Sequence, residues 1–450
     1  MSAPSIDLKE ILDMSPETEK IAVTQGLLFI TPSLVITVIS YILFFLLRDM
    51  GTEQLNTISV TITSAIILSL VGTAGMQILV YRIIDEGKYA HDMTATARSV
   101  RMGVISAVLF SAGASALLYS YFQNALHFPV FYFAHFSALL TLYSLTWIII
   151  IPFWAAGAYR YPALIFTFSY LVVLSLSYGL YQMNPDYVIT GYTIGTSVLL
   201  LLSLLAARGS PGGRQKIPGL RGDLKILPGL IFRNLSPVIY NVCYVLAIFL
   251  DKIIVWVTQG RASGKGLLLT GPYTTGAFLG LIPMFSVMAI VFFTSKVRLL
   301  TDDMYLSRLT DIQKRTRRYK YLYDSSLRSM LLIWAVLFTL ITCFSLDYIR
   351  DPEVVKVAIT VAAGSLFFLI IAYDAVVLPF FGRIRISMIS MLLVCIFQAS
   401  AVFFVGLDVW YAAAGFLAGS FAGFLVSHFA TRRLLSVFEY NLFRLLILSA

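Results

Sequence analysis

Charged residues are scarce in this sequence. Asp, Glu, Lys and Arg make up 12% of its 450 residues, whereas hydrophobic residues make up 59%. A soluble globular protein carries about 25% charged residues, so the composition excludes an ordinary soluble domain and indicates an integral membrane protein. In a bilayer the number of structural units has to be read from repeats rather than from length.

Cysteine is rare too. Cys243, Cys343 and Cys395 all fall in apolar segments, which is typical of small buried side chains rather than of a disulfide framework or a metal cluster. The stretch GRASGKG from Gly260 is one residue too short for a phosphate-binding loop, and Gly266 replaces the hydroxyl residue that would hold magnesium. The sequence therefore predicts no metal, no cofactor and no enzymatic activity.

What the sequence does contain is long apolar runs. Twelve of them approach the length of about 20 residues that a membrane-spanning helix needs. They lie near residues 26–47, 57–81, 102–122, 131–156, 162–183, 187–207, 237–257, 273–295, 329–346, 355–381, 386–406 and 409–430. The predicted fold class is therefore an all-α integral membrane protein with about twelve transmembrane helices.

The basic residues predict the orientation of these helices. If the N-terminus is cytoplasmic, the inside segments hold 27 Lys and Arg, the outside segments hold 5, and Lys252 lies within a span. This asymmetry is the positive-inside signal, so both termini are expected in the cytoplasm and the chain in the inner membrane. Topology and anionic membrane lipids then explain the net charge of +10, and no nucleic acid is expected as a partner.

The chain also divides into two halves of similar pattern. Each half has a basic segment after its second helix, at 82–101 and at 296–328, and 208–236 is rich in Gly, Pro and basic residues. This pattern predicts two parallel six-helix bundles related by an axis along the membrane normal. Near helix starts or within helices stand three prolines that are candidate hinges: Pro32, Pro237 and Pro283.

The resulting domain order runs along the whole chain. It consists of a cytoplasmic amphipathic segment (1–25), the first lobe (26–207), a cytoplasmic linker (208–236), the second lobe (237–433) and a cytoplasmic tail (434–450). Within the second lobe, 296–328 is predicted as an amphipathic cytoplasmic helix lying on anionic lipid, with docking of a partner protein as the alternative.

An acid and a base stand side by side in the apolar seventh span, at Asp251 and Lys252. Tyr240, Tyr244 and Asp251 follow helical steps and share one face. A carboxylate facing lipid would cost about 2.5 kcal/mol or more, so Asp251 is expected to face protein or water. Lys252 is expected to reach outward to the outer mouth of the bundle, close to Trp256.

A stripe of small polar residues in the second span matches this face. Thr57, Thr61, Ser64, Gly72 and Gly75 recur at helical steps. A cavity between the lobes would use both faces, which makes the threonines and Ser64 candidates for a substrate path together with Asp251, Tyr240 and Tyr244. The alternative is that Asp251 holds two helices together and the small residues allow close packing.

Two further polar residues lie inside spans. Asp374 in the tenth span is a candidate for coupling to a proton or another ion, and an ion pair with Arg or Lys is the alternative. His135 in the fourth span is alone, and we interpret it as a hydrogen-bonded core residue.

Several segments together resemble one family. They are IDLKEIL from Ile6, residues 82–89, YNVCYVLAIFLDKIIVWV from Tyr240, and FLGLIP from Phe278. These segments, and above all Tyr240-Asn241 followed by Asp251-Lys252 and Trp256, resemble PelG-type exopolysaccharide transporters of the multidrug/oligosaccharidyl-lipid/polysaccharide exporter superfamily. The resemblance implies two MATE-like lobes around a central cavity, with Asn241 joining the candidate substrate path.

The same resemblance implies a function. It is export of a Pel-like, amino-sugar-containing polysaccharide or its precursor, alongside a cytoplasmic glycosyltransferase and membrane scaffold subunits. Three alternatives stay open from the residues alone: a flippase for lipid-linked oligosaccharides, a cation-coupled drug antiporter, and a membrane scaffold that transports nothing.

The charge asymmetry generates a prediction about topology. Asn124→Cys and Arg317→Cys, each in a cysteine-free background, should react oppositely with a membrane-impermeant thiol reagent added to intact cells. We expect labelling at position 124 and none at position 317, because basic segments stay inside. The reverse labelling pattern would overturn the predicted orientation.

Overall fold

The computed structural model of the chain describes residues 16–437, except 48, 91, 93, 125–127, 209–219, 263–270, 292, 295–311, 350 and 407. These described residues form α-helices, short 3-10 helices and connections, with no strand among them. A helix satisfies its backbone polar groups internally, which an apolar solvent requires. The segments predicted at 1–25, 208–236, 296–328 and 434–450 lie partly outside the described residues.

The described residues of the first half of the chain form seven helices and a 3-10 turn. They are α2 (Pro16–Leu46), α3 (Thr52–Tyr89), α4 (Thr94–Asn124), α5 (Val130–Ile149), α6 (Ile151–Ala155), α7 (Arg160–Tyr181), η1 (Pro185–Tyr187) and α8 (Val188–Arg208). The predicted linker contains a helix of its own, α9 (Leu220–Arg233).

The second half repeats this succession. Its elements are α10 (Leu235–Ala262), α11 (Pro272–Leu281), η3 (Ile282–Val287), α13 (Ile312–Tyr348), α14 (Pro352–Phe380), α15 (Ile384–Ser400), η5 (Ala401–Phe403) and α16 (Trp410–Ser436). Helices α2 and α10 begin, and α14 and α16 finish, at the same end of the bundle. We call it the basic end, because Arg82, Lys88, Arg98 and Arg101 belong to it.

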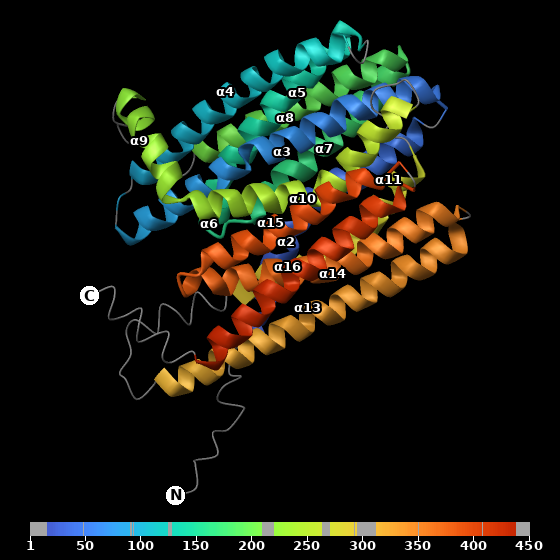
Figure 1. Ribbon diagram of the computed structural model, residues 1–450. Helices are drawn as coiled ribbons and strands as arrows, with labels where there is room; N and C mark the ends of the chain where they lie inside the picture. Colours follow the sequence, from blue (N-terminus) through green and yellow to red (C-terminus); the bar gives the residue numbers. More distant parts are fainter. Residues whose placement is uncertain are drawn as a thin grey trace, which may run out of the picture.

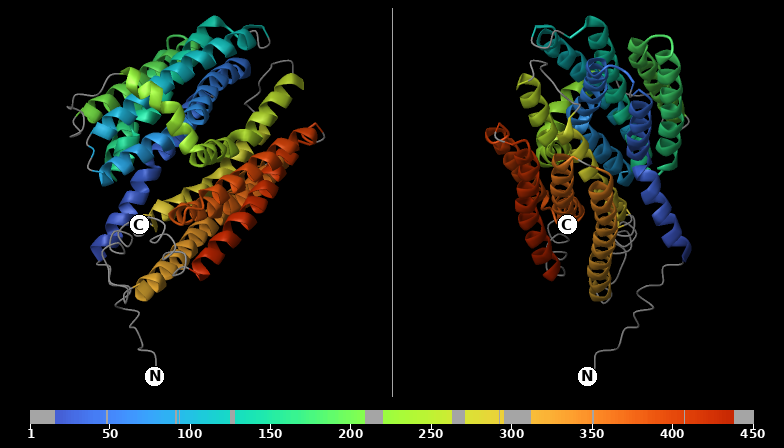
Figure 2. Two further views of the ribbon diagram at one scale, coloured as in Figure 1. Left: turned by 60° about the vertical axis from the view of Figure 1, so that its left-hand side comes forward. Right: turned by 90° about the vertical axis from the view of Figure 1, so that its right-hand side faces the viewer.

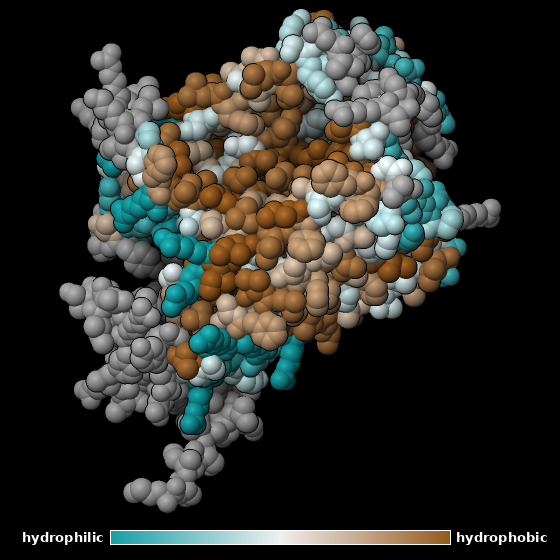
Figure 3. All heavy atoms as spheres, viewed as in Figure 1, coloured by the Kyte–Doolittle hydropathy of each residue, from teal (hydrophilic) through white to brown (hydrophobic). Residues whose placement is uncertain are grey.

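The helices have the lengths and the surface of a membrane protein. Among the described residues, 11 helices are long and apolar enough to cross a membrane, and the apolar stretch Thr24–Ser40 of α2 adds a twelfth. A broad apolar band covers the face shown in Figure 3, with hydrophilic side chains gathered toward the ends of the helices. The prediction of an all-α membrane protein with about twelve spans is confirmed.

Helix packing follows the same plan in both halves (Figures 1 and 2). In the first half α2 packs on α7, α3 on α5 and α7 on α8. The counterparts in the second half are α10 on α15, α11 on α14 and α15 on α16. Each half therefore has a core of its own, and equivalent helices make equivalent contacts.

The two halves meet along α3 and α10, which pack against each other. The amide nitrogen of Asn241 donates to the carbonyl oxygen of Ala74 at 2.7 Å. Gly75 lies so close that a Cβ there would be 3.0 Å from Cγ1 of Val238. Trp256 of α10 is part of the apolar core of the first half. α10 is thus part of the second half in the order of the chain, but it also packs against helices of the first half.

The structure differs from the expected surface helix at 296–328. Residues 312–328 are the first part of α13, a single helix of 37 residues. At about 1.5 Å per residue it is roughly 55 Å long, which exceeds the hydrocarbon thickness of about 30 Å. Tyr319, Tyr323 and Leu327 pack into the core of the second half. In the described part of the segment, 312–328, these three side chains are therefore covered by protein, whereas residues 296–311 lie outside the described residues.

Glycines bring helix backbones into contact within each half. A Cβ added at Gly191 of α8 would lie 2.6 Å from the backbone nitrogen of Ser177, and one at Gly423 of α16 would lie 2.6 Å from the carbonyl oxygen of Ser390. Gly280 of α11 approaches the carbonyl oxygen of Ala358 in the same way. Small residues at such crossings are typical of membrane helices, because close approach increases van der Waals contact.

Substitution of Gly280 tests this packing. A Cβ there would meet backbone atoms of α14 at 2.6 Å and 3.0 Å, so Gly280→Ala should destabilise the protein by about 1–3 kcal/mol. The measurement is the thermal unfolding midpoint of purified protein in detergent. Gly179→Ala in α7 is the matched control, because a Cβ added at Gly179 would have no other atom within 4 Å. Equal unfolding midpoints for the two variants would refute the packing role of Gly280.

Candidate functional site

Asp251 and Lys252 form a buried ion pair in α10. The Lys252 Nζ lies 2.9 Å from Oδ1 and 3.1 Å from Oδ2 of Asp251, and each side chain is 1% exposed. The same Nζ donates to the carbonyl oxygen of Ile248 at 2.9 Å. Since neighbouring residues of a helix point about 100° apart, the lysine side chain reaches its partner by folding back over its own helix.

Lys252 therefore does not extend to the outer mouth as predicted. An ammonium group buried in protein is costly unless it is paired and hydrogen-bonded, and Asp251 and the Ile248 carbonyl oxygen supply both conditions. Trp256 also lies inside rather than at a mouth. It is 3% exposed, and its Nε1 donates to Oγ1 of Thr274 at 2.8 Å.

A third side chain completes the group around the ion pair. The hydroxyl of Tyr273, in the first turn of α11, donates to Oδ2 of Asp251 at 2.8 Å. Tyr273 is fully buried. The carboxylate thus joins α10 to α11, and these are the contacts expected from the alternative in which Asp251 holds two helices together.

The other candidates on α10 have different surroundings. The rings of Tyr240 and Tyr244 are 6.1 Å apart, and Tyr244 stacks on Phe368 of α14 at 5.1 Å. Both tyrosines are half-buried. Asn241 points the other way, toward α3, where it bonds to Ala74. The tyrosines and Asn241 therefore lie on two faces of α10.

The polar stripe on α3 is also divided between two neighbours. The hydroxyls of Thr57 and Thr61 bond to carbonyl oxygens of α3 itself, and Thr61 is fully buried while Ser64 is half-buried. Gly72 faces Phe110 of α4, whereas Gly75 faces α10. The stripe allows α3 to pack closely on both helices.

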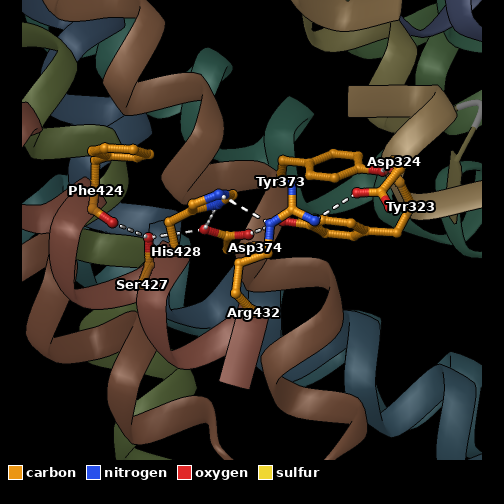
Figure 4. A network of polar contacts seen from close by, with 8 residues as sticks. All are labelled: Tyr323, Asp324, Tyr373, Asp374, Phe424, Ser427, His428 and Arg432. Carbon is orange, nitrogen blue, oxygen red and sulfur yellow. Dashed lines mark hydrogen bonds and ion pairs between the residues drawn. The ribbon is translucent and has the colours of Figure 1, made fainter. Parts of the chain in front are cut away.

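Asp374 has a more varied environment at the basic end of the second half (Figure 4). Its side chain is 0% exposed. The Tyr323 hydroxyl of α13 donates to Oδ1 at 2.6 Å, and the Ser427 hydroxyl of α16 donates to Oδ2 at 3.1 Å. Three helices, α13, α14 and α16, therefore meet at one carboxyl group whose hydrogen-bond donors are hydroxyls.

Two residues of α16 lead from Asp374 toward the surface. The Nδ1 of His428 lies 3.5 Å from Oδ2 of Asp374. The Nε of Arg432 donates to Nε2 of His428 at 3.2 Å, and an Nη of Arg432 donates to Oδ1 of Asp324 at 2.6 Å. Arg432 and Asp324 are 45% and 41% exposed. The network thus runs from a buried acid to an ion pair in contact with solvent.

The candidate hinges occupy three different positions. Pro32 lies in the interior of α2, which continues through it, and Pro283 lies where α11 passes into η3. Pro237 is the third residue of α10, where a proline interrupts no helical hydrogen bond. Pro237 therefore stands at the start of a helix, whereas a proline that kinks a helix lies in its interior.

A family model matches most of the chain. The PelG model, which describes an exopolysaccharide exporter (EPS-E), matches residues 26–443. The chain belongs to this family. PelG proteins are transporters, so this chain is a membrane transporter and not an enzyme.

Solved structures of MOP superfamily transporters share the fold of this chain. An outward-facing MATE transporter of the MOP superfamily aligns with a TM-score of 0.68 at 12% identity, over 96% of this chain and 98% of that chain. A MOP superfamily transporter from Pyrococcus furiosus aligns with a TM-score of 0.66 at 13% identity, over 93% and 97%. This likeness confirms the MATE-like fold. No curated protein sequence matches the chain.

Sequence reasoning missed most partners of the two buried acids. Tyr273 stands outside the face of α10 that contains Asp251 and comes from another helix. His428 and Arg432, spaced i and i+4 in SHFATRR, were a usable signal, because a histidine inside an apolar span rarely lacks a polar partner. Tyr323 was assigned to a surface segment rather than to the core.

The geometry of the Asp251 pair generates a prediction. Asp251→Asn should deplete folded protein from the membrane, because removing one member of a buried pair typically costs about 3–5 kcal/mol. Asp251→Asn combined with Lys252→Met should recover much of the abundance, since no charge is then left unpaired. Membrane abundance and the unfolding midpoint in detergent measure both effects.

Tyr273→Phe is the milder companion, with an expected cost of about 1 kcal/mol for one hydrogen bond. Normal abundance of Asp251→Asn together with lost glycan export would contradict a structural pair and indicate direct contact between Asp251 and substrate.

Proposed function

We propose that this chain exports an amino-sugar-containing exopolysaccharide, or its precursor, across the cytoplasmic membrane along a path between its two halves. The observation that carries the proposal is the match of the PelG exopolysaccharide exporter model over residues 26–443. The fold adds support, because the two similarly packed halves joined along α3 and α10 suit a transporter in which one half moves against the other.

The distribution of charge supports an orientation for this transport. The segments expected inside hold 27 of the 33 Lys and Arg residues, and Arg82, Lys88, Arg98 and Arg101 belong to the basic end, so by the positive-inside rule we expect this end in the cytoplasm. Both termini are then cytoplasmic. A glycosyltransferase that makes the polymer would deliver it at the same end, and membrane scaffold subunits would be further partners.

We assign the substrate path to the half-buried aromatic face of α10. The rings of Tyr240 and Tyr244 are suited to stack on sugar rings, and Tyr244 is held by Phe368. On α3 the path would include Thr57 and Ser64. Asp251 would reach a substrate amine only after its pair with Lys252 opens, since both side chains are closed off from solvent.

Asp374 is the proposed coupling residue. A fully buried carboxyl group whose hydrogen-bond donors are hydroxyls can exist with or without its proton without breaking a full ion pair. Asp251 lacks this freedom, because its charge balances that of Lys252. A gradient of protons across the membrane would therefore act on Asp374.

The test is complementation of a strain that lacks the chain. The wild-type chain should restore a glycan to the medium, identified by chemical analysis of its sugars, whereas Asp374→Asn should reach normal abundance and restore about tenfold less or none. The amide keeps the shape of the side chain and removes its titration. Loss of an unrelated glycan, or full export by Asp374→Asn, would refute the substrate and the coupling residue respectively.

A further inference from the structure

A buried carboxyl group that exchanges a proton needs a route to water. Asp374 has no exposed surface, whereas His428, one helix turn from Arg432, is 20% exposed. His428 lies between Asp374 and the solvent-exposed pair of Arg432 and Asp324 (Figure 4). Tyr323 also contacts both Asp374 and Arg432, but only His428 has two ring nitrogens, one toward the buried carboxyl group and one toward the surface ion pair.

The contacts of Arg432 define which nitrogen of His428 carries the proton. An arginine side chain donates hydrogen bonds and accepts none, so Nε2 of His428 must accept the bond from Nε of Arg432. In the neutral ring the proton is then on Nδ1. This nitrogen faces Oδ2 of Asp374 at 3.5 Å, and a shift of about half an ångström would form a hydrogen bond.

We propose that His428 carries the coupling proton between Asp374 and the cytoplasm, and that Arg432 closes this route. The inference rests on the proposed function of Asp374 as the coupling residue. The observed arrangement is the state after release of the proton. The carboxylate oxygens face donors from Tyr323, Ser427 and His428, and the Arg432 guanidinium occupies the outer nitrogen of the ring.

The proton is conserved at every step. When Arg432 is displaced, Nε2 takes a proton from water as Nδ1 gives its proton to the Asp374 carboxylate, which leaves a neutral ring with its proton on Nε2. Release runs the same transfers in reverse, beginning when the protonated carboxyl group of Asp374 gives its proton to Nδ1. The O–H bond breaks as the Nδ1–H bond forms, and the ring becomes an imidazolium. The Nε2–H bond then breaks and water takes that proton. Nε2 is left free to accept the bond from Arg432 again.

Arg432 acts as a gate because its guanidinium and a protonated His428 ring are both cations and cannot stay adjacent. A protonated Nε2 cannot accept a hydrogen bond, and an imidazolium 3.2 Å from a guanidinium is repelled by it. Arg432 is held in place by Asp324 at 2.6 Å and lies over the ring of Tyr323 at 5.3 Å. Both partners belong to α13, so a movement of α13 relative to α16 would withdraw the arginine.

The remaining neighbours do not supply a competing base. Tyr373 of α14 donates its hydroxyl to the carbonyl oxygen of Tyr323 at 2.8 Å, and Tyr240 of α10 is within electrostatic reach of Asp374. Arg383 and Arg385 of α15 are exposed at the same end. The ring of Phe424 stacks on His428 at 5.2 Å and restricts its rotation.

Export in the complemented strain tests the relay. His428→Asn places an amide near Nδ1, so it keeps the shape and a hydrogen-bond donor but cannot pass a proton through the ring. We expect normal abundance, export reduced about tenfold or more, and loss of the dependence of export on cytoplasmic pH. His135→Asn is the matched control, because His135 bonds to Thr190 and Thr193 in the first half and should export like the wild type.

Proton leak in proteoliposomes tests the gate without any glycan. With a pH-sensitive dye trapped inside, Arg432→Gln should dissipate an imposed pH gradient several-fold faster than the wild type, and adding His428→Asn should abolish this leak. No faster dissipation in Arg432→Gln would overturn the gate.

The outcomes separate the relay from the proposed function. A wild-type pH profile in His428→Asn, with export lost in Asp374→Asn, would overturn the relay and leave the proposed function intact. Full export by both variants would overturn the coupling role of Asp374 itself.

Discussion

Close contact between helix backbones is the constraint on which this structure depends. Lipid tails are as apolar as leucine side chains, so no hydrophobic force pulls the helices together inside the bilayer. Glycines in α8, α11 and α16 compensate by letting backbones approach until a single added carbon would collide. The contact of α8 on α7 recurs as the contact of α16 on α15, each with a glycine at the crossing, which helps to explain how two bundles with different side chains share one packing plan.

This shared plan carries different chemistry in its two cores. In the first half, the hydroxyls of Tyr143, Tyr170 and Tyr192 form a fully buried cluster, with oxygen separations of 2.6, 3.2 and 3.4 Å. The second half contains the acidic network around Asp374 at its basic end. If equivalent helices move equivalently and Asp374 couples transport as proposed, the second half would convert that movement into a change of protonation. In that case both halves would move in the same way, and the proton exchange that controls the movement would lie in the second half.

The helices could be predicted from the sequence, because the apolar length that makes a segment span the membrane depends only on the residues of that segment. Spans, their order and the parallel repeat follow from apolar length and punctuation, and the structure has helices in the described part of each predicted span. The surface helix expected at 296–328 differs from the structure over the described residues 312–328, and the reason is physical. Its amphipathic face suits lipid and protein equally, and only the position of Tyr319 and Tyr323 against the second core distinguishes the two.

The contacts between helices could be predicted from the sequence less well than the helices themselves. Asp251 was correctly expected to avoid lipid, since it is 1% exposed, but Lys252 was expected to extend outward because helical geometry points it away from its neighbour. The flexible lysine stem folds back, and Tyr273 arrives from α11. Such pairings depend on how helices are placed next to each other, which periodicity along one helix does not contain.

The buried pair in α10 has an electrical consequence. A membrane potential acts on a single elementary charge with about 2.3 kcal/mol per 100 mV across the full membrane. Asp251 and Lys252, 2.9 Å apart, carry no net charge together. When α10 shifts between conformations, the potential therefore does almost no work on this pair. If Asp374 couples transport as proposed, the voltage dependence of the cycle would arise at its carboxyl group, where a proton and its charge come and go.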